Sequence, residues 1–132
     1  MSLSTVRSAL ETRLETITDL NVYKQVPDAL GKLPAAIVSL ESADYELALT
    51  KPAVMWRFRV LLLVGDRDSE AAYSTLDGYV SRTGDTSILA AIEGGSVGDF
   101  VTVRRAENVG GISYRGAAFV GAEFIVDVVD SS

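Results

Sequence analysis

The side chains best suited to chemistry in this sequence are carboxylates. Asp66, Asp68 and Glu70 stand at alternate positions, a spacing that could direct three carboxylates at a calcium or magnesium ion. A calcium loop also needs further ligands and a glycine in its middle, so this pattern is incomplete. Capping of a following helix by Asp68 or Ser69 explains the same residues, and we expect that role instead.

A second acidic pair, Asp44 and Glu46, brackets Tyr45. Two carboxylates could serve as general acid and general base, but no second carboxylate pair or nucleophile is recognisably placed near them. We therefore expect this segment to be a solvated loop or an extended hairpin arm.

The sequence contains no cysteine and no histidine. Their absence excludes a thiolate nucleophile, a disulfide framework, an imidazole general base and any metal site built on these ligands. The remaining chemistry belongs to carboxylates, Lys, Tyr, Ser and Thr. A carboxylate site for Mg²⁺ or Ca²⁺ stays possible. Because no group of residues resembles an active site, the sequence predicts no enzyme, no cofactor and no metal centre.

The most basic stretch contains Arg104, Arg105 and Arg115, on either side of the glycine-containing sequence NVGG. These cations could contact a phosphate backbone or an acidic partner, and a solvated hairpin with NVGG as its turn is the plainer interpretation. The nearby glycines do not match a dinucleotide-binding motif, because they precede a predicted strand and not a helix.

Apolar periodicity predicts the elements that position these residues. Apolar residues spaced three or four positions apart indicate helices over residues 4–17, 69–84 and 86–93. Alternating or continuous apolar runs indicate strands over residues 21–26, 35–40, 55–64, 100–106 and 112–129. This order predicts one α+β domain spanning residues 1–132, with a mainly antiparallel or mixed sheet of about five strands and two to three helices on one face.

The other face of the predicted sheet is expected to be only partly covered. In the third strand, Trp56 and Phe58 alternate with Arg57 and Arg59, so the arginines point toward water or a partner. The last strand has one apolar face, and its opposite face carries Glu123 and Asp127 among apolar residues. Ala118, Val120, Ala122, Phe124, Val126 and Val128 make up that apolar face.

The overall charge narrows the classes of partner. The 132 residues include 12 basic and 18 acidic side chains, a net charge of −6. That balance argues against nonspecific wrapping of nucleic acid and against binding to anionic lipid. No apolar run has the length of a membrane span, and no signal peptide is evident. We expect the protein to remain in the cytoplasm where it is made.

Several segments together resemble a known family. They are LETRL, VYKQVPDAL, AAIV, WRFRVLLLVGDRDSEAAYSTLDGYV and GGISYRGAAFVGAEFIVDV, spread from residue 10 to residue 129. In order and in scattered residues they resemble the small tail terminator, or tail completion, proteins of long-tailed bacteriophages. The resemblance implies a ring, typically a hexamer, at the head-proximal end of the tail tube in the virion, assembled in the host cytoplasm.

The resemblance also implies partners and the absence of catalytic residues. The ring would stop polymerisation of the tail tube protein, present a docking surface to head–tail connector proteins, and let DNA pass through its lumen without specific binding. Two polar regions are our candidate interfaces, residues 44–52 and residues 104–115. Their candidate contact residues are Asp44, Tyr45, Glu46, Lys51, Arg104, Arg105, Tyr114 and Arg115.

Two other functions remain open from the sequence. A head–tail connector or adaptor on the portal side would have the same fold and composition. A small cytoplasmic ligand- or metal-binding domain, or a carboxylate enzyme, would use Asp66, Asp68 and Glu70, which a metal titration would reveal.

Overall fold

The computed structural model describes residues 3–23, 32–45, 53–98 and 100–130. Within these ranges the chain forms three helices and five strands. In chain order they are α1 (Leu3–Glu15), β1 (Asn21–Tyr23), β2 (Ala35–Asp44), β3 (Val54–Asp66), α2 (Glu70–Val80), α3 (Ile88–Glu93), β4 (Phe100–Tyr114) and β5 (Ala117–Asp130).

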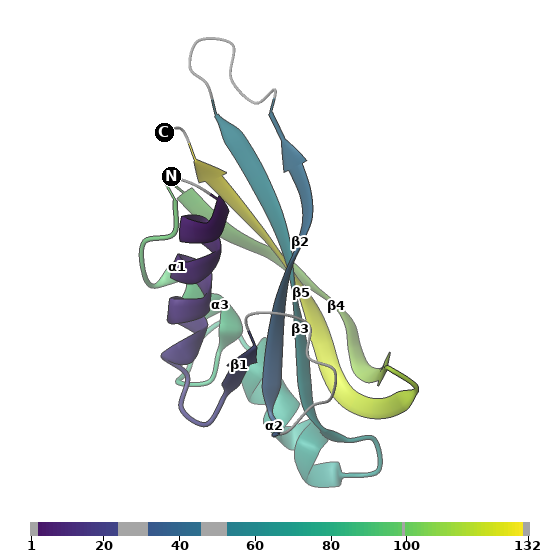
Figure 1. The fold of residues 1–132 in the computed structure, drawn as a ribbon. Helices are drawn as coiled ribbons and strands as arrows, with labels where there is room; N and C mark the ends of the chain where they lie inside the picture. Colours follow the sequence, from purple (N-terminus) through teal and green to yellow (C-terminus); the bar gives the residue numbers. More distant parts are fainter. Residues whose placement is uncertain (1–2, 24–31, 46–52, 99, 131–132) are drawn as a thin grey trace.

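The five strands form one mixed sheet in the order β1-β2-β3-β5-β4. Strand β1 is parallel to β2, and every other neighbouring pair is antiparallel. All three helices lie on the same side of the sheet (Figure 1). The predicted fold class, an α+β arrangement around a mixed five-stranded sheet, is confirmed.

The main core lies between the helices and the sheet. Val6, Leu10 and Leu14 recur every four residues on one side of α1 and are fully buried. The apolar face predicted for the last strand is buried from Val120 to Val128 at alternate positions, whereas Ala118 at its beginning is exposed. The apolar face of α1, which recurs every four residues, therefore packs in the same core as the apolar face of β5, which recurs every two residues.

The second and third helices begin at serine caps. The hydroxyl of Ser69 accepts a hydrogen bond from the Ala72 amide at 3.1 Å, and Ser87 accepts one from Ala90 at the same distance. These caps satisfy amide groups that the first helical turn leaves unpaired. The predicted end of α2 at Gly84 is wrong, because Ser81 already adopts an extended backbone and its amide donates to the Asp77 carbonyl.

The predicted turn at NVGG is also wrong. Residues 108–111 lie inside β4, where two register shifts against β5 absorb the extra residues as bulges. The chain reverses instead at Arg115 and Gly116, whose φ angles of 50° and 84° match the type I′ hairpin turn. Residues 104–115 are therefore part of one long strand followed by its turn, and not a hairpin of their own.

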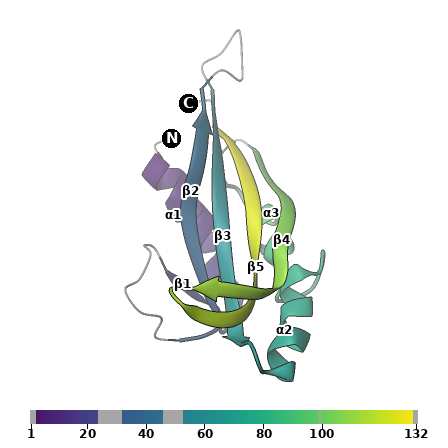
Figure 2. The ribbon, with the colours of Figure 1, turned by 90° about the vertical axis from the view of Figure 1, so that its right-hand side faces the viewer.

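The far end of the β4–β5 hairpin bends toward the face opposite the helices (Figures 1 and 2). The bend coincides with the bulges in β4 and with another between Leu63 and Gly65 in β3. Gly121 of β5 permits the close approach here, because a Cβ at this position would overlap the Leu62 carbonyl oxygen. Apolar residues outside the main core are buried as well: Ala35, Ile37, Leu63, Ile112 and Ile125.

Strands β2 and β3 extend further than predicted. Residues 41–44, expected in a loop or arm, continue β2, and β3 begins at Val54 and ends at Asp66. The two strands project beyond the helices as a long pair (Figure 1). The predicted contact residues Glu46 and Lys51 lie outside the described residues.

Candidate assembly surface

A network of charged side chains crosses the sheet on the face away from the helices. Its members come from four adjacent strands. Alternation directs Arg57 and Arg59 of β3 to one side, and Glu123 and Asp127 of β5 to the same side. Arg104 and Arg105 are consecutive and can share that side because the β4–β5 register shifts between Val103 and Arg105. We call this set the open-face network. It consists of Glu41 on β2, Arg57 and Arg59 on β3, Glu123 and Asp127 on β5, and Arg104, Arg105 and Glu107 on β4.

Asp127 is one centre of the network. Arg57 stands directly opposite Asp127 in the β3–β5 register and donates to both of its carboxylate oxygens, at 2.8 and 3.1 Å. Arg104 donates to the same carboxylate at 3.2 Å from the other side. The contact with Arg57 is bidentate, as the planar geometries of guanidinium and carboxylate favour.

Arg59 is the second centre and joins three strands. It donates to Glu41 of β2 at 3.1 Å and to Glu123 of β5 in a shorter contact. The Glu107 carboxylate of β4 lies 4.0 Å from the same guanidinium and accepts a hydrogen bond from Arg105 at 2.6 Å. The network thus links the outer strand β4 to β2 across the whole width of the antiparallel sheet.

The contacts shift the proton affinities of several members. Burial of Asp127 favours its neutral form, but hydrogen bonds and charge from Arg57 and Arg104 outweigh this and hold its pKa below the ordinary value. The hydrogen bond from Arg105 lowers the pKa of Glu107. Hydrogen bonds to carboxylates raise the pKa values of Arg57 and Arg59. These four shifts all favour the charged forms of Arg57, Arg59, Glu107 and Asp127 at neutral pH.

The network is electrically balanced. It contains four arginines and four carboxylates, so its own net charge is zero. Asp127 is only 5% exposed, whereas the Arg104 and Arg105 side chains are 52% and 61% exposed. The outer part of the network, on β4, can therefore exchange its ion pairs with groups of another molecule at small desolvation cost.

The structure places the predicted contact residues at three separate sites. Arg104 and Arg105 belong to the open-face network in the first half of β4. Asp44 ends β2, and the adjacent Tyr45 packs its ring edge against Trp56 at a centroid distance of 6.3 Å. Tyr114 and Arg115 lie at the hairpin turn, where the Arg115 guanidinium stands 5.7 Å from the Tyr114 ring centre.

Tyr114 and Trp56 each contribute to packing as well as to the surface. The Tyr114 hydroxyl is buried without a hydrogen-bond partner among the described residues, so Tyr114 is partly a packing residue. Trp56 is partly buried against the main core and also borders the exposed Tyr45.

Sequence reasoning missed the partners of the arginines. Arg57, Arg59, Glu123 and Asp127 were each expected on the outer face, but their pairing depends on the β3–β5 register. Glu41 and Glu107 were not singled out at all. One signal could have identified them. Glu41 and Glu107 lie in or next to predicted strands, and opposite charges on one face of a sheet attract each other across strands, so they were possible partners for Arg57 and Arg59.

The acidic residues considered for metal binding are spread over different elements. Asp66 ends β3, Asp68 lies in the following turn and Glu70 begins α2. Among the described residues, no group of three or more His, Cys, Asp or Glu side chains is positioned to hold a metal ion. None of the helices in those residues has the length and apolar composition needed to cross a membrane.

No protein-family model and no curated protein matches the chain.

Proposed function

We propose that this protein is a structural component of a bacteriophage tail that assembles into a ring at the head-proximal end of the tail tube. There it ends polymerisation of the tube protein and offers the surface to which the head joins. The proposal originates in the family resemblance of the sequence. The structural observation that supports it best is the open-face network, a wide charged surface on the side of the sheet that none of the described helices covers.

A surface of this kind suits assembly between folded subunits. Interfaces that form between soluble proteins have a polar, solvent-accessible rim, and they are enriched in arginine and aromatic residues relative to the rest of the surface. The network supplies arginines that are half exposed, and Tyr45 and Phe100 are 69% and 63% exposed. Arginine and aromatic side chains contribute disproportionately to binding energy at interfaces.

The first test measures the native mass of the purified protein and images it with tail tubes. We expect closed rings, seen by electron microscopy at one end of the tube, and tubes of abnormal length in a phage that lacks the protein. A chain that never associates with itself or with tube ends would overturn the proposal. Tails of normal length that fail to join heads would instead favour a connector on the portal side.

The second test reverses charge within the network. Arg105→Glu replaces an exposed cation of the network by an anion. If an acidic surface of a neighbouring copy contacts this residue, assembly should weaken about tenfold or more, since like charges across an interface disfavour binding. The matched control is Lys32→Glu, which makes the same change of net charge at an exposed residue outside the network. Equal ring formation by Arg105→Glu and Lys32→Glu would remove the network from the interface.

A further inference from the structure

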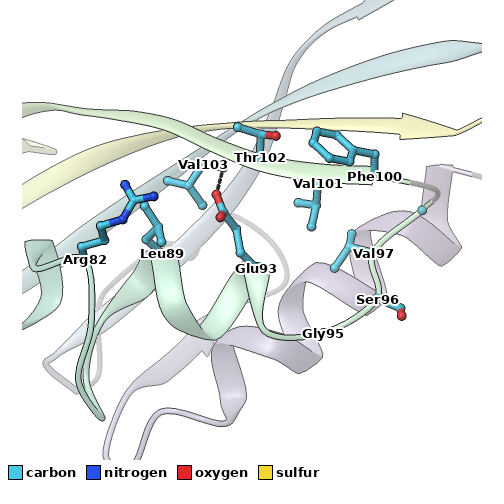
Figure 3. A pocket seen from close by; sticks show the side chains of 11 residues that line it. Arg82, Leu89, Glu93, Gly95, Ser96, Val97, Phe100, Val101, Thr102 and Val103 are labelled. Carbon is cyan, nitrogen blue, oxygen red and sulfur yellow. Dashed lines mark hydrogen bonds between the residues drawn. The ribbon is translucent and has the colours of Figure 1, made fainter.

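Strand β4 lies at one margin of the sheet, and its outer edge borders a groove. The groove encloses about 540 Å³ between α3, the following segment and the beginning of β4 (Figure 3). Glu93 projects from α3 toward β4, as Figure 3 shows. The lining is partly apolar and includes one cation: Arg82, Leu89, Glu93, Val97, Val101 and Val103.

The Glu93 carboxylate caps this edge. It accepts a hydrogen bond of 2.9 Å from the Val103 amide, which therefore points away from β5. In an antiparallel pair, residues two apart point their backbone groups in the same direction. The amide and carbonyl of Val101 consequently face the groove as well. Among the described residues, no strand pairs with β4 on this side.

The opposite margin of the sheet has a second open edge. As far as the structure describes it, up to Tyr23, strand β1 pairs with Ala35, Ala36 and Ile37 of β2. The remainder of β2, residues 38–44, has no strand partner on that side within the described part of the chain. This segment carries Glu41 and Asp44 and no cation, whereas Arg104 and Arg105 follow Val103 on β4 and Arg82 lines its groove. The two edges are therefore complementary in charge.

Strand direction makes the two edges compatible. Three successive antiparallel pairings give β2 and β4 opposite directions. When two copies stand in the same orientation, β4 of one copy runs antiparallel to β2 of the next. The beginning of β4 then lies beside the end of β2, which brings the exposed Phe100 near the exposed Tyr45. Further along, Arg104 comes near Glu41 on the same face of the sheet.

We infer that the outer edge of β4 binds a second copy of this chain through residues 38–44 of β2. The Glu93 carboxylate leaves the Val103 amide as the two strands pair. Because the two edges differ, each copy keeps one free edge after pairing, so the contact repeats and a ring forms when the rotation closes. In the free chain, Glu93 protects an edge that would otherwise pair with any exposed strand.

This inference rests on the proposed ring and specifies the contact between its subunits. Two edge variants test it. Val101→Pro removes an outward amide from β4 without touching the bonds to β5, as proline permits on an edge strand. Glu41→Lys combined with Tyr45→Lys reverses the charge and removes the aromatic ring at the edge of β2. The matched control is Tyr73→Lys, at another exposed aromatic residue, on α2.

The readout is sedimentation velocity of each variant alone and of a 1:1 mixture. We expect each edge variant to lose assembly, while the control assembles like the natural chain. The mixture should form dimers and stop there, because the Val101→Pro chain keeps its β2 edge and the other variant keeps its β4 edge. Thermal melting checks that every variant is folded, and Phe100→Lys offers a second change at β4 whose side chain is already exposed.

Glu93→Ala tests the capping role separately. It should strengthen self-association about fivefold, the equivalent of one hydrogen bond of about 1 kcal/mol. Unchanged or weaker association of this variant would show that Glu93 does not guard the edge.

The possible failures are distinguishable. Rings that form normally from both folded edge variants, or a mixture that stays monomeric, would overturn the edge pairing and leave the ring itself standing. If the natural chain assembles only on tail-tube ends, the same variants and the control are compared there. A natural chain that assembles neither alone nor on tube ends would overturn both the pairing and the proposed function.

Discussion

Asp127 is the most enclosed acid of the open-face network and couples folding to pH. Its pKa lies below the ordinary value in the folded chain, because the hydrogen bonds from two arginines outweigh burial. A carboxylate with a lowered pKa stabilises the folded state above its unfolded pKa of about 4. That stability disappears as the pH falls through the lower, folded pKa.

We therefore expect Asp127→Asn to lower the free energy of unfolding by about 1–2 kcal/mol at pH 7. The difference from the natural chain should shrink as the pH falls below about 4, where the natural carboxylate becomes protonated too. Urea unfolding at pH 7 and at pH 3 measures both values. Glu15→Gln, which removes an exposed carboxylate of α1, is the control. A difference that stays constant across this pH range would contradict the assignment.

Gly121 sets the distance between β3 and β5 at the bend of the hairpin. Gly121→Ala should destabilise the fold by about 1–3 kcal/mol, because its methyl group would overlap the Leu62 carbonyl and force the strands apart. Gly111→Ala is the matched control, since the nearest atom to a Cβ there is an Arg67 nitrogen at 3.9 Å. Chemical denaturation compares the two. Equal stability of both variants would show that the strands adjust without cost.

At the scale of elements, the cap of α2 belongs to Ser69. Ser69→Ala should cost about 1 kcal/mol, since it leaves the Ala72 amide without its acceptor. Asp68→Ala, the other residue that the sequence suggested as cap, should change stability much less. Thermal denaturation of both variants decides between them, and the reverse ranking would move the cap to Asp68.

The sequence was informative wherever one face of an element is buried. The four-residue spacing in α1 and the alternation in β3 and β5 were enough to predict the layers and the buried face of the sheet. The turn was misplaced because Gly110 and Gly111 are as typical of a bulge as of a turn. Only the pairing register distinguishes the two, and register depends on long-range contacts.

The candidate surface was predictable only in part. Alternation indicated that Arg57 and Arg59 point outward, but it could not say which carboxylates face them. The hydrogen bond between the Glu93 carboxylate and the Val103 amide forms because α3 packs beside β4. This packing is a tertiary contact, so no local sequence pattern predicts it. Arg104 and Arg105 were selected for their charge, and the structure adds that their partners are Asp127 and Glu107.

At the scale of the whole molecule, divalent cations should have no specific effect. The carboxylates of Asp66, Asp68 and Glu70 belong to a strand end, a turn and a helix start. We expect millimolar Ca²⁺ or Mg²⁺ to leave the melting temperature unchanged, because a ligand stabilises a protein only when it binds the folded state. A rise in melting temperature that Asp68→Ala abolishes would revive the metal-binding function.

The charge balance of the open-face network has a consequence for the electrostatic repulsion between copies of the protein. The network uses four of the 12 basic and four of the 18 acidic side chains, so the full net charge of −6 resides elsewhere on the molecule. Two copies repel each other through those other regions, and less where neutral surfaces approach. Added salt screens this repulsion. At low ionic strength, approach of two copies is therefore least opposed where the margins of the network, Arg104 and Arg105 on β4 and Glu41 on β2, face each other.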